Sequence, residues 1–337
     1  MGPSEGISPS SGTSQGRKGH STPVGGVQSK IDVSDRRLIL VLGKGGVGRS
    51  TVAAALASRL AARGKRTLLY QANANDRFGM YFNKPALGTE VTELAPNLCG
   101  VNTNPAAALA EYGMMVLKFK SVYEMVFENR ITKAFLRAVP GLDDYSLLGK
   151  AWFHVEEQHR GQPVWNSVVF DMPASGHSIS TLRIPWSIGD TVPEGPLTKD
   201  AHAIRQLLCD PSRTAAVIVT LAEEMPVNEA CELEDKLTGL GIVPQHVICN
   251  QIYPPHFPTH SATARILDTL AADPQLASPL GDVVAHAALS RDRRELNQRY
   301  LRELAARAKA PVSELPMVFA ASLGPQHILE LGALLLT

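Results

Sequence analysis

One stretch near the start of the chain limits the folds available to it more than any other. Residues 38–42 (LILVL) are uniformly apolar, as in a buried strand, and residues 43–48 then contain four glycines. From Ser50 to Arg63 the apolar residues recur with a helical spacing. Glycines let backbone N–H groups turn toward an anion, and the N-terminus of the following helix adds unpaired N–H groups. Strand, glycine-rich turn and helix together predict a phosphate-binding loop.

The loop fits the P-loop pattern G-x-x-x-x-G-K-[ST] at every position except one, because Arg49 stands where the pattern has lysine. In such loops the hydroxyl after that position is a Mg²⁺ ligand, so Ser50 is the expected metal ligand. The residues expected to contact the nucleotide are Gly43, Lys44, Gly45, Gly46, Val47, Gly48, Arg49, Ser50 and Thr51.

A second motif follows another apolar run, residues 164–170 (VWNSVVF), which is expected to be a core strand. It ends in Asp171, and a carboxylate at the carboxyl end of a hydrophobic strand is the Walker B arrangement, which places an acid near Mg²⁺. Asp171 is therefore the second expected metal ligand. In the following run, DMPASGH, we expect Gly176 to turn its N–H toward a γ-phosphate, as switch loops do.

These motifs resemble a known family. GKGGVG, with lysine directly after the first glycine, resembles the deviant Walker A group of P-loop ATPases. In that group the early lysine reaches the nucleotide of a partner subunit, which implies the same role for Lys44. The run at 171–177 is similar to D-T-A-P-T-G-H of the arsenite-pump and tail-anchored-protein targeting ATPases, with its proline moved to Pro173. The resemblance covers about residue 37 to the C-terminus.

The resemblance also shows where this chain departs from the pattern. After the second strand, expected at residues 66–71, those ATPases carry D-P-A-H, whose Asp orients the attacking water. Counted from the paired leucines of that strand, Asn73 stands at the Asp position. Asparagine keeps the shape but cannot take a proton. Asp76 from a shifted loop is one alternative, and a plain polar loop across residues 73–80 is another.

A further site residue follows a later strand, expected at residues 246–250 (HVICN). The resembling ATPases carry V-N-Q at this strand end, where the Asn binds the adenine edge. An amide offers both a donor and an acceptor, as adenine does. Asn250 is therefore the adenine candidate. The nucleotide expected at the site is ATP with Mg²⁺.

Strands and helices alternate along the chain, and the strands are uniformly apolar. This pattern predicts a doubly wound α/β fold with a mostly parallel sheet covered on both faces. Residues 1–36 are rich in Gly, Ser, Pro and Thr and are expected to be a disordered tail. Residues 37–337 are expected to form one P-loop ATPase domain, interrupted over about 85–163 by a mostly helical insertion. The resemblance implies that this insertion handles a protein client or a partner subunit.

Composition argues against several other classes. The net charge of +1 gives no electrostatic case for nucleic acid as the main partner. No apolar run approaches the roughly 18 residues of a membrane span, and the N-terminus lacks an apolar signal core, so a cytoplasmic protein is expected. The four cysteines are isolated in the sequence, which gives little support to a zinc site, a redox dithiol or arsenite binding by clustered thiols.

Two main functional hypotheses follow. The first is a dimeric, Mg²⁺-ATP-driven switch for client handling or transport, in which a second subunit is needed because the chain has one P-loop and Lys44 must cross to a partner. The second is a nucleotide-sensing subunit that hydrolyses little and pairs with a complete ATPase in a heterodimer. Arg49 and Asn73 favour weak hydrolysis, whereas Lys44 and Asp171 are retained. A septum-site or chromosome-positioning ATPase also stays open, although the final ILELGALLLT lacks the basic face of a membrane-surface helix.

Overall fold

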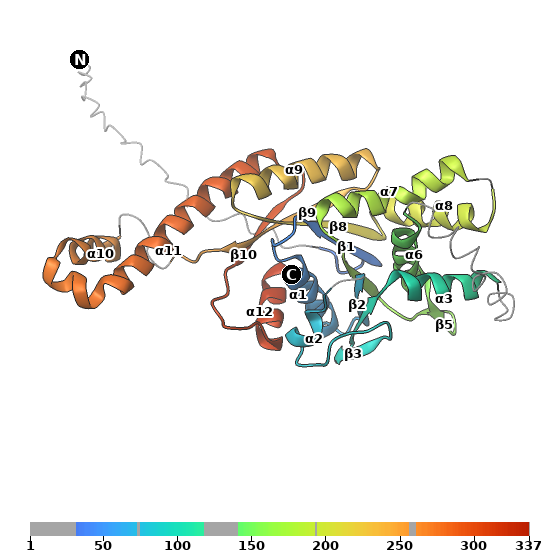
Figure 1. The fold of residues 1–337 in the computed structure, drawn as a ribbon, viewed down its shortest axis with the longest axis horizontal. Coiled ribbons are helices and arrows are strands. Elements are labelled where there is room, and N and C mark those ends of the chain that lie inside the picture. Colours follow the sequence, from blue (N-terminus) through green and yellow to red (C-terminus); the bar gives the residue numbers. More distant parts are fainter. Residues whose placement is uncertain (1–31, 73–74, 118–140, 193, 256–260, 337) are drawn as a thin grey trace, which may run out of the picture.

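The computed structural model describes residues 32–336 except 73–74, 118–140, 193 and 256–260. Its centre is an eight-stranded sheet in the order β10-β9-β8-β1-β7-β2-β4-β3 (Figure 1). Neighbouring strands are parallel except for β3 and β4. A separate short hairpin pairs β5 (Gln158–His159) with β6 (Gln162–Pro163). The strands of the large sheet are β1 Leu38–Gly43, β2 Thr67–Ala72, β3 Thr92–Ala95, β4 Leu98–Thr103, β7 Ser167–Asp171, β8 Thr214–Leu221, β9 Pro244–Ile252 and β10 Val312–Pro316.

Helices cover both faces of this sheet, because alternate residues of each strand point to opposite sides. Leu38, Leu40 and Leu42 of β1 join a core with α6, α7, α8, α9 and α11, whereas Ile39 and Val41 join a second core with α1, α2 and α12. The predicted doubly wound, mostly parallel fold is confirmed. The helices are α1 Arg49–Ala62, α2 Phe78–Tyr81, α3 Pro105–Leu117, α6 Leu142–Glu156, α7 Ser175–Thr191, α8 Pro196–Cys209, α9 Glu224–Gly239, α10 Ala262–Ala272, α11 Pro274–Arg307 and α12 Pro325–Leu335.

The strand order differs from the simplest expectation in one place that matters for the site. The unit β1–α1–β2 is expected to bring β1 and β2 together as a parallel pair. The two strands are parallel members of one sheet, but β7 lies between them and pairs with both. Sequence neighbours are therefore separated by a strand that comes about a hundred residues later. Its last residue, Asp171, comes to lie beside the end of β1.

The segment at 182–199 also differs from expectation. Its prolines and glycines predict a broken segment, yet α7 continues through Pro185 to Thr191. Proline removes one intrahelical hydrogen bond, which normally ends or kinks a helix. Here the buried side chains recur every three or four residues along one stripe, so packing on the sheet outweighs the local preference. The stripe consists of Ser178, Thr181, Leu182, Pro185 and Ile188.

The region expected to be a helical insertion, residues 85–163, is helical only in part. β3 and β4 belong to it and join the main sheet. α3 and α6 are helical and are linked by an ion pair between Glu111 and Lys150. Most of the helix expected over 114–138 lies outside the described residues, as does most of the expected tail.

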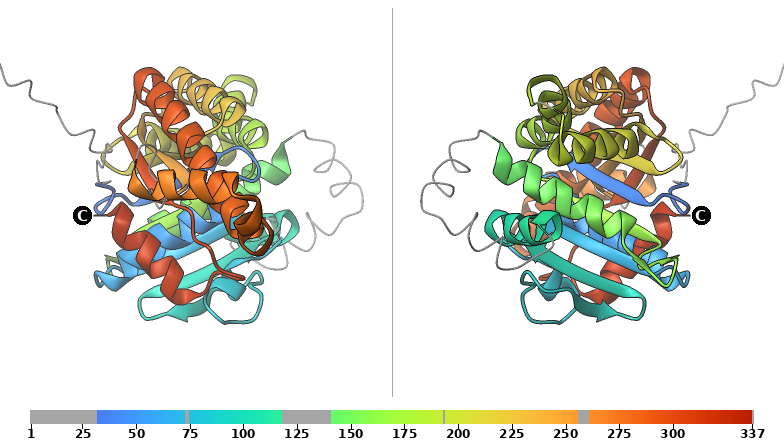
Figure 2. Two further views of the ribbon diagram at one scale, coloured as in Figure 1. Left: turned by 90° about the vertical axis from the view of Figure 1, so that its left-hand side faces the viewer. Right: turned by 90° about the vertical axis from the view of Figure 1, so that its right-hand side faces the viewer.

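The C-terminal part of the chain holds a second helical feature. α11 begins at Pro274 and runs for 34 residues, and β10 follows it from Val312. Figure 1 shows α10 and the first part of α11 projecting together from the body of the protein, and the left view of Figure 2 looks onto this end. Among the described residues no helix combines the length and the apolar character required to cross a membrane.

The cysteines are free thiols, as expected for isolated residues. Cys249 is buried in β9, while the other three are half-buried. Burial raises the pKa of all four thiols, so each is held in its protonated, less reactive form.

His246 gives the fold a pH dependence. It lies in β9 with 3% of its surface exposed, and its Nε2 is 2.6 Å from the hydroxyl of Ser313 in β10. Burial lowers the pKa of His246 from 6.5 to about 4. Between these two values the unfolded chain binds a proton that the folded chain does not bind. The free energy of unfolding therefore falls as the pH is lowered through this window.

We expect this residue alone to remove about 2 kcal/mol of stability between pH 7 and pH 4.5. Urea unfolding of wild type and His246→Gln at both pH values measures the effect. The variant should lose about 2 kcal/mol less than wild type, because glutamine does not titrate. His159→Gln, at an exposed histidine, is the matched control. Equal pH dependence in wild type and His246→Gln would contradict the assignment.

Candidate nucleotide-binding site

The glycine-rich loop connects β1 to α1 at the carboxyl edge of the sheet, and two of its glycines are required by their surroundings. A Cβ on Gly43 would lie 2.3 Å from the carbonyl oxygen of Val219 in the neighbouring β8. Gly48 has φ +90°, a conformation that favours glycine, and its Cβ would lie 2.3 Å from Nδ2 of Asn250. The loop therefore packs directly on the ends of β8 and β9. Gly45 and Gly46, at its tip, are exposed.

Asn250 connects the loop to the end of β9. Its side chain is buried, and Nδ2 donates a 2.9 Å hydrogen bond to the carbonyl of Val47. The sequence singled out Asn250 as an adenine ligand, whereas the structure gives it a contact with the loop backbone. A second amide hydrogen and the Oδ1 atom take no part in that bond.

Ser50 and Asp171 meet below the loop, as the two motifs predict. Ser50, in the first turn of α1, donates a 2.6 Å hydrogen bond to Oδ2 of Asp171. Burial raises the pKa of Asp171, and the Ser50 hydroxyl and the charge of Arg49 oppose this shift. Oδ1 of Asp171 is buried and has no hydrogen-bond partner among the described residues. A buried carboxylate oxygen that accepts no hydrogen bond is rare in native proteins.

This oxygen set fits a magnesium ion. Mg²⁺ is usually bound by one or two carboxylates together with waters and the phosphates of its nucleotide, rather than by an all-protein cage. The described part of the chain accordingly holds no cluster of three or more His, Cys, Asp or Glu side chains able to hold a metal. Ser50 Oγ and the unpaired Oδ1 of Asp171 are oxygen atoms beside the loop that can coordinate the ion.

Arg49, which stands where the P-loop pattern has lysine, contacts the protein backbone. Its guanidinium donates to the backbone carbonyl of Met172, the residue after Asp171. Burial lowers the pKa of Arg49, and the Asp171 charge opposes that shift. Arg49 therefore ties the start of α1 to the segment after β7. No feature of the sequence predicts this contact, because it joins residues more than a hundred positions apart.

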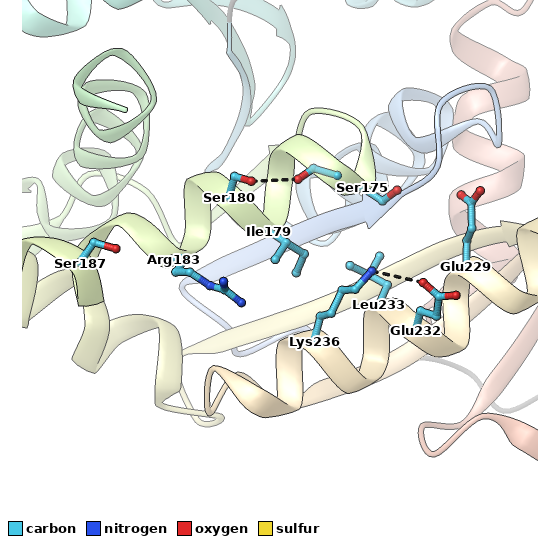
Figure 3. Close-up of a pocket in the computed structure, with 10 residues that line it drawn as sticks. Ser175, Ile179, Ser180, Arg183, Ser187, Glu229, Glu232, Leu233 and Lys236 are labelled. Atoms are coloured by element: carbon cyan, nitrogen blue, oxygen red, sulfur yellow. Dashed lines mark hydrogen bonds and ion pairs between the residues drawn. The ribbon is translucent and has the colours of Figure 1, made fainter. Parts of the chain in front are cut away.

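Lys44 is held within its own chain. Its Nζ lies 2.6 Å from Oε1 of Glu229 in α9, and about one third of each side chain is exposed, 35% and 33%. Glu229 also lines a pocket of about 580 Å³ between α7 and α9, and Figure 3 shows it at one end of that pocket. Sequence reasoning missed Glu229, which follows no recognisable motif. The ion pair places α9 against the loop.

The segment after β7 lies beside the same pocket. Gly176 is exposed in the first turn of α7 and lines the pocket, and helix geometry leaves N–H groups of a first turn without intrahelical partners. His177 is exposed, and its Nε2 lies 3.0 Å from Oδ1 of Asp144 in α6. This contact ties the start of α7 to α6.

The loop after β2 is described in part. Asn73 lies outside the described residues, so its expected role stays a prediction. Asp76 accepts hydrogen bonds from the N–H groups of Phe78, Gly79 and Leu87, at 2.9, 3.0 and 3.0 Å. These bonds hold Asp76 at the start of α2, which argues against its moving into the place of a catalytic acid. The hydroxyl of Thr51, 3.0 Å from that of Tyr81, ties α1 to α2.

Comparison with known proteins agrees with this geometry. Residues 36–194 and 196–265, well over half of the chain, match the anion-transporting ATPase family. The chain belongs to that family. The resemblance to the arsenite-pump and tail-anchored-protein targeting ATPases, drawn from the run at 171–177, is thereby confirmed. Both motifs lie within the matched residues.

Individual members differ in how much of their length they share with the chain. The chain is 30% identical over 235 residues to the ATPase BagA of Mycobacterium tuberculosis, covering 66% of this chain and 67% of BagA. It is 28% identical over 253 residues to an arsenical pump-driving ATPase of Escherichia coli, covering 68% of this chain and 40% of that protein. It is 25% identical over 264 residues to the ATPase GET3 of Kluyveromyces lactis, covering 67% and 75%.

Proposed function

We propose that this member of the family binds MgATP at residues 43–51 and acts as a dimeric, nucleotide-dependent switch with weak hydrolysis. The observation that carries the proposal is the Ser50–Asp171 pair. It joins the two phosphate-site motifs by a 2.6 Å hydrogen bond and leaves Oδ1 of the acid without a partner. The N–H groups of the loop and of the first turn of α1 bind the phosphates. Mg²⁺ held there neutralises the charge that develops on the phosphates during transfer.

The adenine base of the nucleotide would lie near the end of β9. Asn250 keeps one amide hydrogen and its Oδ1 for the donor–acceptor edge of adenine while its other hydrogen holds Val47. The same side chain would then couple the base to the shape of the phosphate loop. Adenine binding by Asn250 belongs to this proposal.

Assembly is proposed to depend on Lys44. In the isolated chain Lys44 is paired with Glu229, so a crossing to a partner's phosphates requires this pair to open. Pairs exposed to this degree contribute only about 0.2–1 kcal/mol, so opening is inexpensive. The pair holds Lys44 in place until a more highly charged partner is presented. A client on the region 85–163 is part of the same proposal.

A second candidate is a nucleotide-sensing subunit that pairs with a complete ATPase in a heterodimer. The contact of Arg49 with Met172 favours it, because the charge that a loop lysine would bring to the phosphates is directed to a backbone carbonyl. The two candidates share the nucleotide site and differ in turnover and in partner.

The first test is nucleotide binding by the full chain, measured by calorimetry with ADP and a non-hydrolysable ATP analogue. We expect binding that is strengthened by Mg²⁺, and we expect Ser50→Ala to lose that Mg²⁺ effect because it removes a metal ligand. Ser322→Ala, at an exposed position before α12, is the control and should behave as wild type. Absence of binding at millimolar nucleotide would disprove the proposal.

The second expectation is slow ATP hydrolysis. Arg49 is committed to Met172, and Asn73 cannot act as a base; losing general-base assistance alone lowers rates by about 10²- to 10⁴-fold. Steady-state assays compare wild type with Arg49→Lys, Asn73→Asp and the double variant. The reversions should raise kcat, most strongly together, while nucleotide affinity changes little. A wild-type rate that is already high and that neither reversion raises would show that these substitutions do not limit the reaction.

The third expectation concerns assembly. Glu229→Gln removes the charge that holds Lys44, so nucleotide should promote dimerisation up to about five-fold more readily than in wild type. Lys44→Ala should abolish the nucleotide effect. Glu232→Gln changes a pocket-lining acid on the same helix, paired with Lys236, and is the matched control. Light scattering with and without ATP analogue measures the outcome. A Glu229→Gln variant that assembles as wild type does would contradict the proposed restraint.

A further inference from the structure

Gln71 lies beside Asp171 in the sheet, although no motif singles it out. The register of β2 and β7 pairs the two residues directly. Paired residues of neighbouring parallel strands point to the same face, as the edge-to-face contact of Tyr70 with Phe170 one position earlier shows. Gln71 therefore faces the same side of the sheet as Asp171.

The Gln71 side chain is buried but only partly satisfied. It is 2% exposed, and its Nε2 lies 3.5 Å from Oδ2 of Asp171, at the limit of a hydrogen bond. Its Oε1 is buried without a hydrogen-bond partner among the described residues, as is Oδ1 of Asp171. A buried polar group without a hydrogen-bond partner destabilises the folded chain. Two such acceptors on directly paired residues therefore indicate a ligand that supplies donors or positive charge.

The polar groups around these two acceptors limit the kind of ligand that can bind there. Ser50 contributes a hydroxyl, Asp171 a carboxylate and Gln71 an amide oxygen, all of which are hard oxygen groups. An anion or an apolar group would leave both acceptors unpaired. A hydrated divalent cation satisfies them, because Mg²⁺ keeps several of its waters and these waters donate hydrogen bonds.

We propose that Gln71 is a positioning residue for Mg²⁺, with its Oε1 accepting a hydrogen bond from a water of the ion's hydration shell. This inference rests on the proposed nucleotide function and extends its metal site to β2. Asp171 and Ser50 hold the ion, and Gln71 orients its water from the neighbouring strand. Such outer-shell partners fix the orientation of metal ligands and govern metal affinity.

The alternative is that Gln71 only fills space and supports Asp171. The two accounts differ for Gln71→Met, which keeps the length of the side chain and removes the unpaired oxygen. Under the proposal the metal-free variant should be at least as stable as wild type, because an unsatisfied buried acceptor is gone. Under the purely structural account it should be less stable and should bind metal normally.

The test measures Mn²⁺ binding to the full chain in the presence of ADP, by electron paramagnetic resonance of free Mn²⁺. Gln71→Met should weaken Mn²⁺ binding by about 10- to 100-fold and leave metal-free ADP affinity unchanged. Gln71→Glu should tighten Mn²⁺ binding because it adds a carboxylate. Gln245→Met is the matched control, since Gln245 donates to the carbonyls of Pro211 and Thr214 at the other end of the sheet.

The outcomes separate this inference from the proposed function. Wild type that binds Mn²⁺ with ADP, together with a Gln71→Met variant of equal affinity, overturns the inference alone. Wild type that binds neither ADP nor Mn²⁺ overturns the proposed function and the inference with it. If Gln71→Met does not fold, Gln71→Glu decides, and an unchanged Mn²⁺ affinity in that variant contradicts the role.

Discussion

The position of β7 between β1 and β2 is the constraint on which the site depends. It pairs Asp171 with Val41 on one side and with Gln71 on the other. A slip of one residue would turn Asp171 to the opposite face, away from Ser50. The register is held at its start by Asn166, whose Oδ1 accepts from the N–H of Arg66 at 2.8 Å. The chemistry at the carboxyl edge thus depends on contacts at the far end of the strands.

The two cationic side chains of the loop, Arg49 and Lys44, differ in the free energy needed to break their contacts. Arg49 donates to a backbone carbonyl, and withdrawing it would leave Met172 without that partner, a loss of about 1–3 kcal/mol for a buried group. Lys44 and Glu229 are both part-exposed, so water replaces each partner when the pair opens. Arg49 is therefore the fixed element of the loop and Lys44 the movable one, although the sequence gives no sign of the difference.

The sequence predicts the parts of this structure that rest on local patterns. Apolar runs predict the strands at 38–42 and 164–170, the glycine spacing predicts the loop, and Asp171 follows from its place at a strand end. The missed features are contacts between distant segments: the insertion of β7, the pairing of Glu229 with Lys44, and the capping of α2 by Asp76. The local sequence pattern around one residue does not indicate which distant residue it will contact. For the same reason the sequence does not predict that α7 continues through Pro185, because the contacts that stabilise the helix there come from residues distant in the sequence.

The buried hydrogen-bond acceptors beneath the loop lower the stability of the folded chain while preparing the site for a ligand. Gln71 and Asp171 leave two oxygens unpaired in the folded chain, although apolar residues at these strand ends would pack without that cost. Buried polar groups left unsatisfied are rare in native proteins and concentrate where a ligand completes them. A ligand that supplies donors recovers this energy on binding, so it stabilises the folded chain as it fills the site. The closing of β7 against β2 is therefore both a feature of the fold and the preparation of the site.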